Sequence, residues 1–238
     1  MQTTINTTAL NTWHRDHGAN MAEFGGYEMP LWYSSVKDEH LAVLTGAGVF
    51  DTSHMAVVTV TGADAKGLLQ DCFTNDLDAC VGAAKKPLEP GRCVYGAFLD
   101  EKGYTIDDAI VFMVAADSYM VVVNAGMGGA IAGHLHQHLG KREAVVADLT
   151  DQLGKMDIQG PAAAKVLGRL LADPEAVFAG MPYFSFKGHY DRSLPQAAAV
   201  RLDDGTPILL SRTGYTGEFG FEIFLAPDKI RHLWERVL

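Results

Sequence analysis

The stretch Gly103-Tyr104-Thr105-Ile106-Asp107-Asp108-Ala109-Ile110-Val111-Phe112 places two adjacent carboxylates at the head of an apolar run. If residues 106–114 form a strand, successive side chains alternate between its faces, so Asp107 and Asp108 point in opposite directions. One carboxylate then faces the core, which is costly unless it is hydrogen-bonded or takes part in chemistry. The stretch therefore predicts either a functional site or a turn after Gly103 with both carboxylates solvated, since Asp is common at turns.

The composition is that of an ordinary globular protein. The chain has 238 residues, of which 48% are hydrophobic and 20% charged, enough for one large domain or two small ones with a real core. Its net charge of -10 disfavours a nucleic-acid partner, which needs a basic face. No apolar run is long enough for a membrane span, and residues 1–8 lack the features of a targeting signal. We expect a cytoplasmic protein with no nucleic-acid or membrane partner.

The cysteines and histidines give no metal-binding motif. Cys72, Cys80 and Cys93 form no CxxC pair, and we expect buried or idle thiols in a reducing compartment. His134 and His138 share one face of a predicted helix, which makes them a possible pair of metal ligands. Because no third ligand stands at a suitable spacing, a solvated helix surface is the preferred interpretation. We therefore predict no metal site.

Hydrophobic periodicity predicts a mixture of helices and strands. Helices are expected at 10–17, 36–45 and 227–238, after Gly62 and Gly160, and over the segment that carries His134 and His138. Strands are expected at 56–60, 93–99, 106–114, 119–124, 144–147 and 155–158. Residues 24–33 are interpreted as a loop whose aromatic side chains pack over either the core or a ligand.

Two features of the first half recur in the second. A strand, a glycine and a helix follow one another at Gly62 and again at Gly160. An acidic turn, residues 99–103 and again 202–205, precedes further strands and a helix. The recurrence indicates two related α+β halves, each a sheet with helices on one face. We assign residues 1–150 to the first half and residues 151–238 to the second.

The densest motif is Ser211–Phe224, whose three glycines indicate a tightly turning backbone. It is neither a phosphate-binding loop nor a dinucleotide fingerprint, because no Gly-Lys-Ser/Thr follows and the next element is a strand. In that strand Glu222 lies on the face opposite Phe221 and Ile223. Its carboxylate suits a ligand with paired N–H donors, such as a 2-aminopyrimidinone ring, or equally an ion pair with a nearby Lys or Arg.

Several stretches together resemble the aminomethyltransferase (T-protein) family of the glycine cleavage system. They occur in the family's order and cover nearly the whole chain: Phe24–Pro30, Gly48–Met55, Thr74–Asp76, Ile106–Asp108, Val123–Ala125, Gln159–Pro161 and Ser211–Glu222.

The resemblance implies that tetrahydrofolate takes a methylene group from the aminomethyl-lipoyl arm of the carrier H-protein, with release of ammonia. The family's catalytic aspartate corresponds to Asp108, near the folate nitrogen that attacks the methylene carbon, and its pterin-binding glutamate to Glu222. The family's folate-lining positions correspond to Met55, Tyr95, Phe112, Asn124, Phe184 and Tyr215.

The implied fold class is α+β, with two related ferredoxin-like halves around a folate channel. Tyr104 and Thr105 depart from the family's Gly-Gly at this turn. The chain also ends before the family's Gly-Leu-Gly-Ala-Arg-Asp segment and its C-terminal barrel-like domain, so we expect a truncated chain. Two alternatives remain: a folate-dependent demethylase of a small methylated substrate, and a non-catalytic folate-binding assembly or regulatory protein.

Overall fold

The computed structural model describes residues 5–80 and 85–238, so the first part of the N-terminal segment analysed for a signal lies outside the described residues. The chain forms two compact units. The inserted unit is Met55–Thr150, and the split unit combines the residues up to His54 with Asp151–Leu238. This division differs from the predicted halves 1–150 and 151–238, because strand β4 (Gly48–Asp51) pairs with β10 (Gly154–Gln159) and joins the early residues to the second half.

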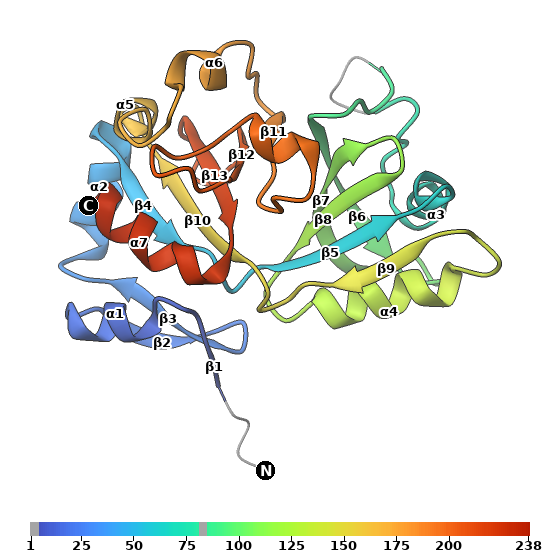
Figure 1. Cartoon of the computed structure of the whole chain (residues 1–238). Helices are drawn as coiled ribbons and strands as arrows, with labels where there is room; N and C mark the ends of the chain where they lie inside the picture. The colour runs from blue at the N-terminus through green and yellow to red at the C-terminus, as the bar shows by residue number, and fades with distance from the viewer. Residues whose placement is uncertain (1–4, 81–84) are drawn as a thin grey trace. The chain divides into compact units, whose positions relative to one another are not determined.

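The inserted unit contains a five-stranded sheet in the order β6-β7-β8-β5-β9, with every neighbouring pair antiparallel (Figure 1). Its elements are β5 (Ala56–Thr61), α3 (Ala65–Cys72), β6 (Arg92–Leu99), β7 (Thr105–Ala115), β8 (Ser118–Val123), α4 (Gly128–His138) and β9 (Val145–Asp148). Val58, Val111 and Val121 on alternating strand positions pack in one core with Leu68 of α3 and Ile131 of α4. Both helices therefore cover the same face of the sheet.

The split unit contains a second five-stranded sheet, in the order β11-β12-β13-β10-β4, and a small sheet in the order β1-β3-β2. Its first elements are β1 (Asn6–Thr7), α1 (Asn11–Asp16), β2 (Asn20–Phe24), β3 (Tyr27–Trp32), α2 (Val36–Thr45) and β4. After β10 come α5 (Ala163–Leu167), α6 (Pro174–Phe178), β11 (Phe186–Gly188), a 3-10 turn (Pro195–Ala198), β12 (Leu209–Ser211), β13 (Gly220–Leu225) and α7 (Pro227–Val237). Ile158 and Ile223 pack with Leu167 of α5 and Leu233 of α7, so these helices share one face of the larger sheet.

The two larger sheets have the same arrangement of four strands. In the inserted unit β6, β7 and β8 lie side by side and β5 follows β8; in the split unit β11, β12 and β13 do so and β10 follows β13. Gly62 after β5 and Gly160 after β10 have φ angles of 120° and 121°. A Cβ atom at either glycine would collide with backbone oxygens, of Glu143 at Gly62 and of Val43 and Gly46 at Gly160. The strand–glycine–helix pattern thus marks positions that only glycine fits.

The segment 24–33, predicted to be a loop, is instead most of a β-hairpin. Strands β2 and β3 pair with Phe24 opposite Tyr27, so Gly25 and Gly26 form a two-residue turn. Both glycines have positive φ, 59° and 83°, which is the geometry that favours tight hairpins. The loop prediction was wrong because the Gly-Gly pair is the signal of a hairpin turn, and the aromatic residues Phe24 and Tyr27 on either side of it belong to the paired strands.

Strand parity in both larger sheets agrees with the sequence. Asp107 lies on the helix-covered side of β7, with Ala109 and Val111, whereas Asp108 lies on the opposite face. In β13, Phe221 and Ile223 face the helices and Glu222 lies on the other face. Each predicted carboxylate ligand, Asp108 and Glu222, therefore belongs to the sheet face opposite the helices of its own unit.

Candidate functional site

The Asp pair of the inserted unit is held by hydrogen bonds from Asn124, the residue that follows β8. The backbone N–H of Asn124 donates to Asp107 Oδ2 at 2.9 Å, and its side-chain Nδ2 donates to Asp107 Oδ1 at 2.8 Å. The same Nδ2 reaches Asp108 Oδ1 at 2.7 Å. Asp107 is buried and both of its oxygens accept hydrogen bonds, so it is the structural member of the pair.

Asp108 is partly exposed and has a second donor. The hydroxyl of Tyr95, on the neighbouring strand β6, donates to Asp108 Oδ2 at 2.8 Å. This hydrogen bond raises the pKa of Tyr95 above its usual value, so the phenol stays a proton donor at neutral pH. Two neutral donors from flanking strands thus fix the Asp108 carboxylate, while no described cation forms a salt bridge with it.

In the split unit, Glu222 belongs to a buried ionic cluster. Lys155 Nζ donates to Glu222 Oε1 at 2.6 Å and to Asp157 Oδ1 at 2.8 Å. Asp157 and Glu222 are direct cross-strand neighbours on β10 and β13, and all three charged side chains are buried. Thr213 donates to Glu222 Oε2, and Thr52 donates to Asp157 Oδ1 at 2.8 Å. The ion pair that sequence reasoning offered for Glu222 is therefore present.

The cluster contains two carboxylates and one ammonium, so its charges do not cancel. Burial and the adjacent Glu222 carboxylate raise the pKa of Asp157 to about 6, although Lys155 acts in the opposite direction. Burial by itself would lower the pKa of Lys155, but Asp157 and Glu222 raise it above its usual value. Lys155 thus stays protonated at neutral pH, and Asp157 takes up a proton as the pH falls through about 6.

The remaining predicted ligand residues are spread over the two units. Met55 is half-buried and Phe112 is fully buried in the inserted unit. In the split unit Tyr215 is 65% exposed. Phe184 has a φ of 57°, and its N–H donates to the carbonyl of Arg212 at 3.1 Å. A bulky residue with positive φ is a genuine outlier, and such strain is concentrated at functional sites.

The structure brings Tyr95, Asp108 and Asn124 together in one hydrogen-bonded group, as their common assignment to a site would require. Sequence reasoning missed Lys155 and Asp157, although the signal was present. These residues alternate with Met156 and Ile158 in β10, so the parity argument used for the Asp pair would have placed two charges on one face.

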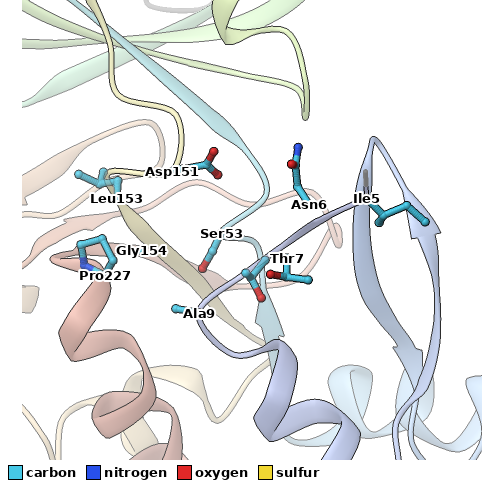
Figure 2. Close-up of a pocket in the computed structure, with 10 residues that line it drawn as sticks. Ile5, Asn6, Thr7, Ala9, Ser53, Asp151, Leu153, Gly154 and Pro227 are labelled. Carbon is cyan, nitrogen blue, oxygen red and sulfur yellow. The ribbon is translucent and has the colours of Figure 1, made fainter. Parts of the chain in front are cut away.

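A separate cavity of about 360 Å³ lies within the split unit (Figure 2). Asn6, Ser53 and Asp151 are among the polar side chains around it. Asp151 accepts a hydrogen bond from the Tyr27 hydroxyl at 2.7 Å, and Ser53 donates to the carbonyl of Lys155 at 2.9 Å. Among the residues that the structure describes, the lining includes none of the predicted folate ligands.

The sequence shows no third ligand at a suitable spacing from His134 and His138, but the packing of α3 against α4 brings a ligand-capable side chain beside them. Cys72, the last residue of α3, has its sulfur among the ligand-capable atoms of the two histidines, all within 4.8 Å of one another. No spacing rule could reveal this group, because Cys72 comes from a distant helix. Cys72, Cys80 and Cys93 are all buried thiols, as predicted.

The sequence was compared with known families and proteins. The family described as the GCVT N-terminal domain matches residues 10–238. An aminomethyltransferase of Bacillus mycoides is 34% identical over 235 residues, which cover 99% of this chain and 58% of the relative. An aminomethyltransferase of Streptomyces coelicolor is 37% identical over 233 residues, covering 98% of this chain and 56% of the relative. The chain thus spans little more than half the length of these relatives.

Solved structures agree. The crystal structure of glycine cleavage system aminomethyltransferase T from Bartonella henselae superposes with a TM-score of 0.77 at 30% identity, covering 99% of this chain and 57% of that one. A heterotetrameric sarcosine oxidase from Corynebacterium sp. U-96 shares the fold, with a TM-score of 0.57 at 16% identity over 84% of this chain and 88% of that one. Within residues 5–80 and 85–238, no helix is long and apolar enough to cross a membrane. The chain belongs to the aminomethyltransferase family, in which it corresponds to the GCVT N-terminal domain.

Proposed function

We propose that this chain carries the folate-binding and catalytic residues of an aminomethyltransferase, which moves a methylene group from the aminomethyl-lipoyl arm of H-protein to tetrahydrofolate and releases ammonia. The observation that carries the proposal is the group formed by Tyr95, Asp108 and Asn124. It supplies a partly exposed carboxylate in a fixed orientation, at the position that corresponds to the family's catalytic aspartate. Tetrahydrofolate would supply the nitrogen nucleophile.

In this proposal Asp108 positions the reacting nitrogen and stabilises the positive charge that develops there. A carboxylate does so best when it is ionised and held before the reaction. Tyr95 and Asn124 each donate one hydrogen bond to a different oxygen of Asp108, which fixes the plane of the carboxylate. Each oxygen keeps a second lone pair for a ligand.

The residues of the split unit fit a pterin ring that presents N–H donors. Lys155 and Thr213 donate to the two oxygens of Glu222, and each oxygen can accept one further hydrogen bond. Lys155 also forms an ion pair with Glu222, which orients the carboxylate. Glu222 is 2% exposed, so direct binding requires a small opening of this face.

The finer architecture is also a proposal. We infer that the two larger sheets, with their common order of four strands and their glycines at equivalent strand ends, are related ferredoxin-like halves. Met55, Phe112, Phe184 and Tyr215 would then supply apolar and aromatic surface for the flat rings of the ligand.

The test is an assay of ammonia release from aminomethyl-lipoylated H-protein in the presence of tetrahydrofolate. Asp108→Ala should lower the rate on the order of 100-fold or more, because it removes a charge that acts in the transition state. Binding of tetrahydrofolate, followed by calorimetry, should remain measurable. Asp117→Ala is the matched control, since Asp117 is an exposed aspartate between β7 and β8.

Each outcome separates the alternatives. Turnover unchanged by Asp108→Ala would remove Asp108 from the mechanism. Folate binding without ammonia release by the unaltered chain would favour the non-catalytic binding protein. Folate-dependent demethylation of a small methylated amine in the absence of H-protein would favour the demethylase.

A further inference from the structure

The inserted unit contains a group of metal-ligating side chains on the helix-covered face of its sheet. Cys72 ends α3, and His134 and His138 lie one turn apart on α4. The Cys72 sulfur and one nitrogen of each histidine lie within 4.8 Å of one another. Asp108 belongs to the opposite face of the same sheet, so this group is separate from the proposed transfer site.

The hydrogen bonds around the group leave lone pairs available. His138 Nδ1 lies 2.9 Å from the carbonyl oxygen of His134. Because a carbonyl can only accept, Nδ1 carries the proton and Nε2 has the free lone pair. Metal-binding histidines are typically held by such a bond from the other ring nitrogen. No described residue hydrogen-bonds to the His134 ring or to the Cys72 sulfur.

Among the charged residues near this group, Arg142 already has an anionic partner. It forms an ion pair with Asp71 and also donates to the His138 carbonyl at 2.7 Å. Zinc binds cysteine as a thiolate, so the Cys72 thiol would release its proton when the ion binds.

We propose that Cys72, His134 and His138 bind one Zn²⁺ ion. A thiolate and two imidazoles form a donor set that binds zinc in preference to hard cations. In a tetrahedral site with Zn–N of about 2.0–2.1 Å and Zn–S of about 2.3 Å, the ligand atoms are roughly 3.3–3.6 Å apart. The atoms now lie within 4.8 Å of one another, so the side chains would rotate toward the ion as it binds. The site joins the end of α3 to α4.

In the proposed site the fourth coordination position faces a cavity of about 520 Å³, which includes both histidines in its lining. The wall of this cavity also contains the charged residues Asp100, Glu101 and Lys102. This cavity gives the ion a path from solvent and leaves room for a water molecule as the fourth ligand. Three protein ligands and one open position describe a site that can exchange its metal, unlike a closed four-ligand structural site.

Cobalt spectroscopy on the chain without an affinity tag tests the proposal. After treatment with a chelator, Co²⁺ should bind with one equivalent and produce a thiolate-to-cobalt charge-transfer band, which Zn²⁺ then abolishes. Zn²⁺ should also raise the melting temperature, since a ligand that binds only the folded state stabilises it. Absence of the thiolate band in the unaltered chain would overturn the proposal.

Variants assign the ligands. His134→Ala and His138→Ala should each weaken Co²⁺ binding on the order of 100-fold or more, at least the effect of losing an outer-shell partner. Cys72→Ser should remove the charge-transfer band. The controls are His136→Ala, an exposed histidine of the same helix, and Cys80→Ser, a buried thiol elsewhere, and both should bind as the unaltered chain does.

Circular dichroism identifies variants that fail to fold. Because His134 and His138 are only half-buried, their alanine variants test the proposal even if Cys72→Ser does not fold. A band that survives Cys72→Ser, or binding that is weakened as much by His136→Ala as by His138→Ala, would overturn the assignment.

Discussion

The two larger sheets share an arrangement of strands but use the face opposite their helices differently. In the split unit this face of β10 and β13 carries Lys155, Asp157 and Glu222, all buried. Thr59 is the position of the inserted unit that corresponds to Asp157, because each lies three residues before the glycine that follows its strand, Gly62 or Gly160. The cross-strand neighbour of Thr59 is Met120. The inserted unit therefore has a hydroxyl and a thioether where the split unit has two carboxylates.

The comparison shows two ways in which a carboxylate on this face can be held, with a cationic partner or with neutral hydrogen-bond donors. Glu222 is buried and therefore needs the opposite charge of Lys155. Asp108 lies at the start of β7, partly exposed, where two neutral donors suffice to hold it. A carboxylate without a cationic partner keeps its full charge for a reacting group, which suits the catalytic role proposed for Asp108.

The largest effect is expected from Lys155→Met, which removes the only cation from the buried cluster. The carboxylates of Asp157 and Glu222, which are direct neighbours on adjacent strands, would then have no positive charge to offset their repulsion. Removing one partner of a buried ion pair typically costs about 3–5 kcal/mol. We expect that loss in the free energy of unfolding, measured by urea denaturation at pH 8, above the pKa of about 6 that Asp157 has in the unaltered chain.

The control is Lys66→Met on α3 of the inserted unit. Lys66 pairs with Asp78, and the two side chains are 38% and 62% exposed. An exposed pair of this kind contributes at most about 1 kcal/mol. If Lys155→Met cost no more than Lys66→Met, the cluster would not be the buried, mutually dependent unit described above.

How much of this comparison could be predicted from the sequence depends on the distance over which each signal acts. Strand parity is local, and it placed Asp107 and Asp108 on opposite faces and Glu222 away from the helices. The same local rule covers Lys155 and Asp157. The ion pair of Lys155 with Glu222 was predicted only in kind, as a salt bridge with some Lys or Arg, because the pairing of β10 with β13 joins residues that are far apart in the chain.

Other features have no local signal. The pairing of β4 with β10 places the early residues in the split unit, and a boundary based on the recurring sequence patterns could not show this pairing. The contact of Cys72 with His134 and His138 depends on how two helices pack. The Asp108 assignment came from family resemblance, and the structure adds its partners Tyr95 and Asn124.

An intermediate effect is expected from the ionisation of Asp157. Its pKa is raised to about 6 in the folded state, above the usual value for Asp. The folded state therefore retains the proton while the unfolded state releases it, and stability falls as the pH rises from about 4 to about 6. A shift of two units corresponds to about 3 kcal/mol at most.

The measurement compares the unaltered chain with Asp157→Asn by urea unfolding at several pH values. The free energy of unfolding of the variant, relative to the unaltered chain, should increase between pH 4 and pH 7 and then level off. Asn keeps an oxygen that can accept from Thr52 and Lys155, so the comparison isolates the charge. A difference that is independent of pH would show that Asp157 is ionised over the whole range.

The smallest effect is expected from Thr59→Val, the position in the inserted unit that matches Asp157. The Thr59 hydroxyl donates to the carbonyl of Ala147 at 3.5 Å, the limit of a hydrogen bond, so its loss should change the free energy of unfolding by less than about 0.5 kcal/mol. Thr213→Val makes the same change in the split unit but removes the donor to the charged Glu222, for which about 1.5–3 kcal/mol is expected. Equal losses from the two valine variants, measured by urea unfolding, would mean that the buried charges do not make this face more sensitive than its counterpart. A loss confined to Thr213→Val would locate that sensitivity in the ionic cluster, because the two substitutions are chemically identical and only their surroundings differ.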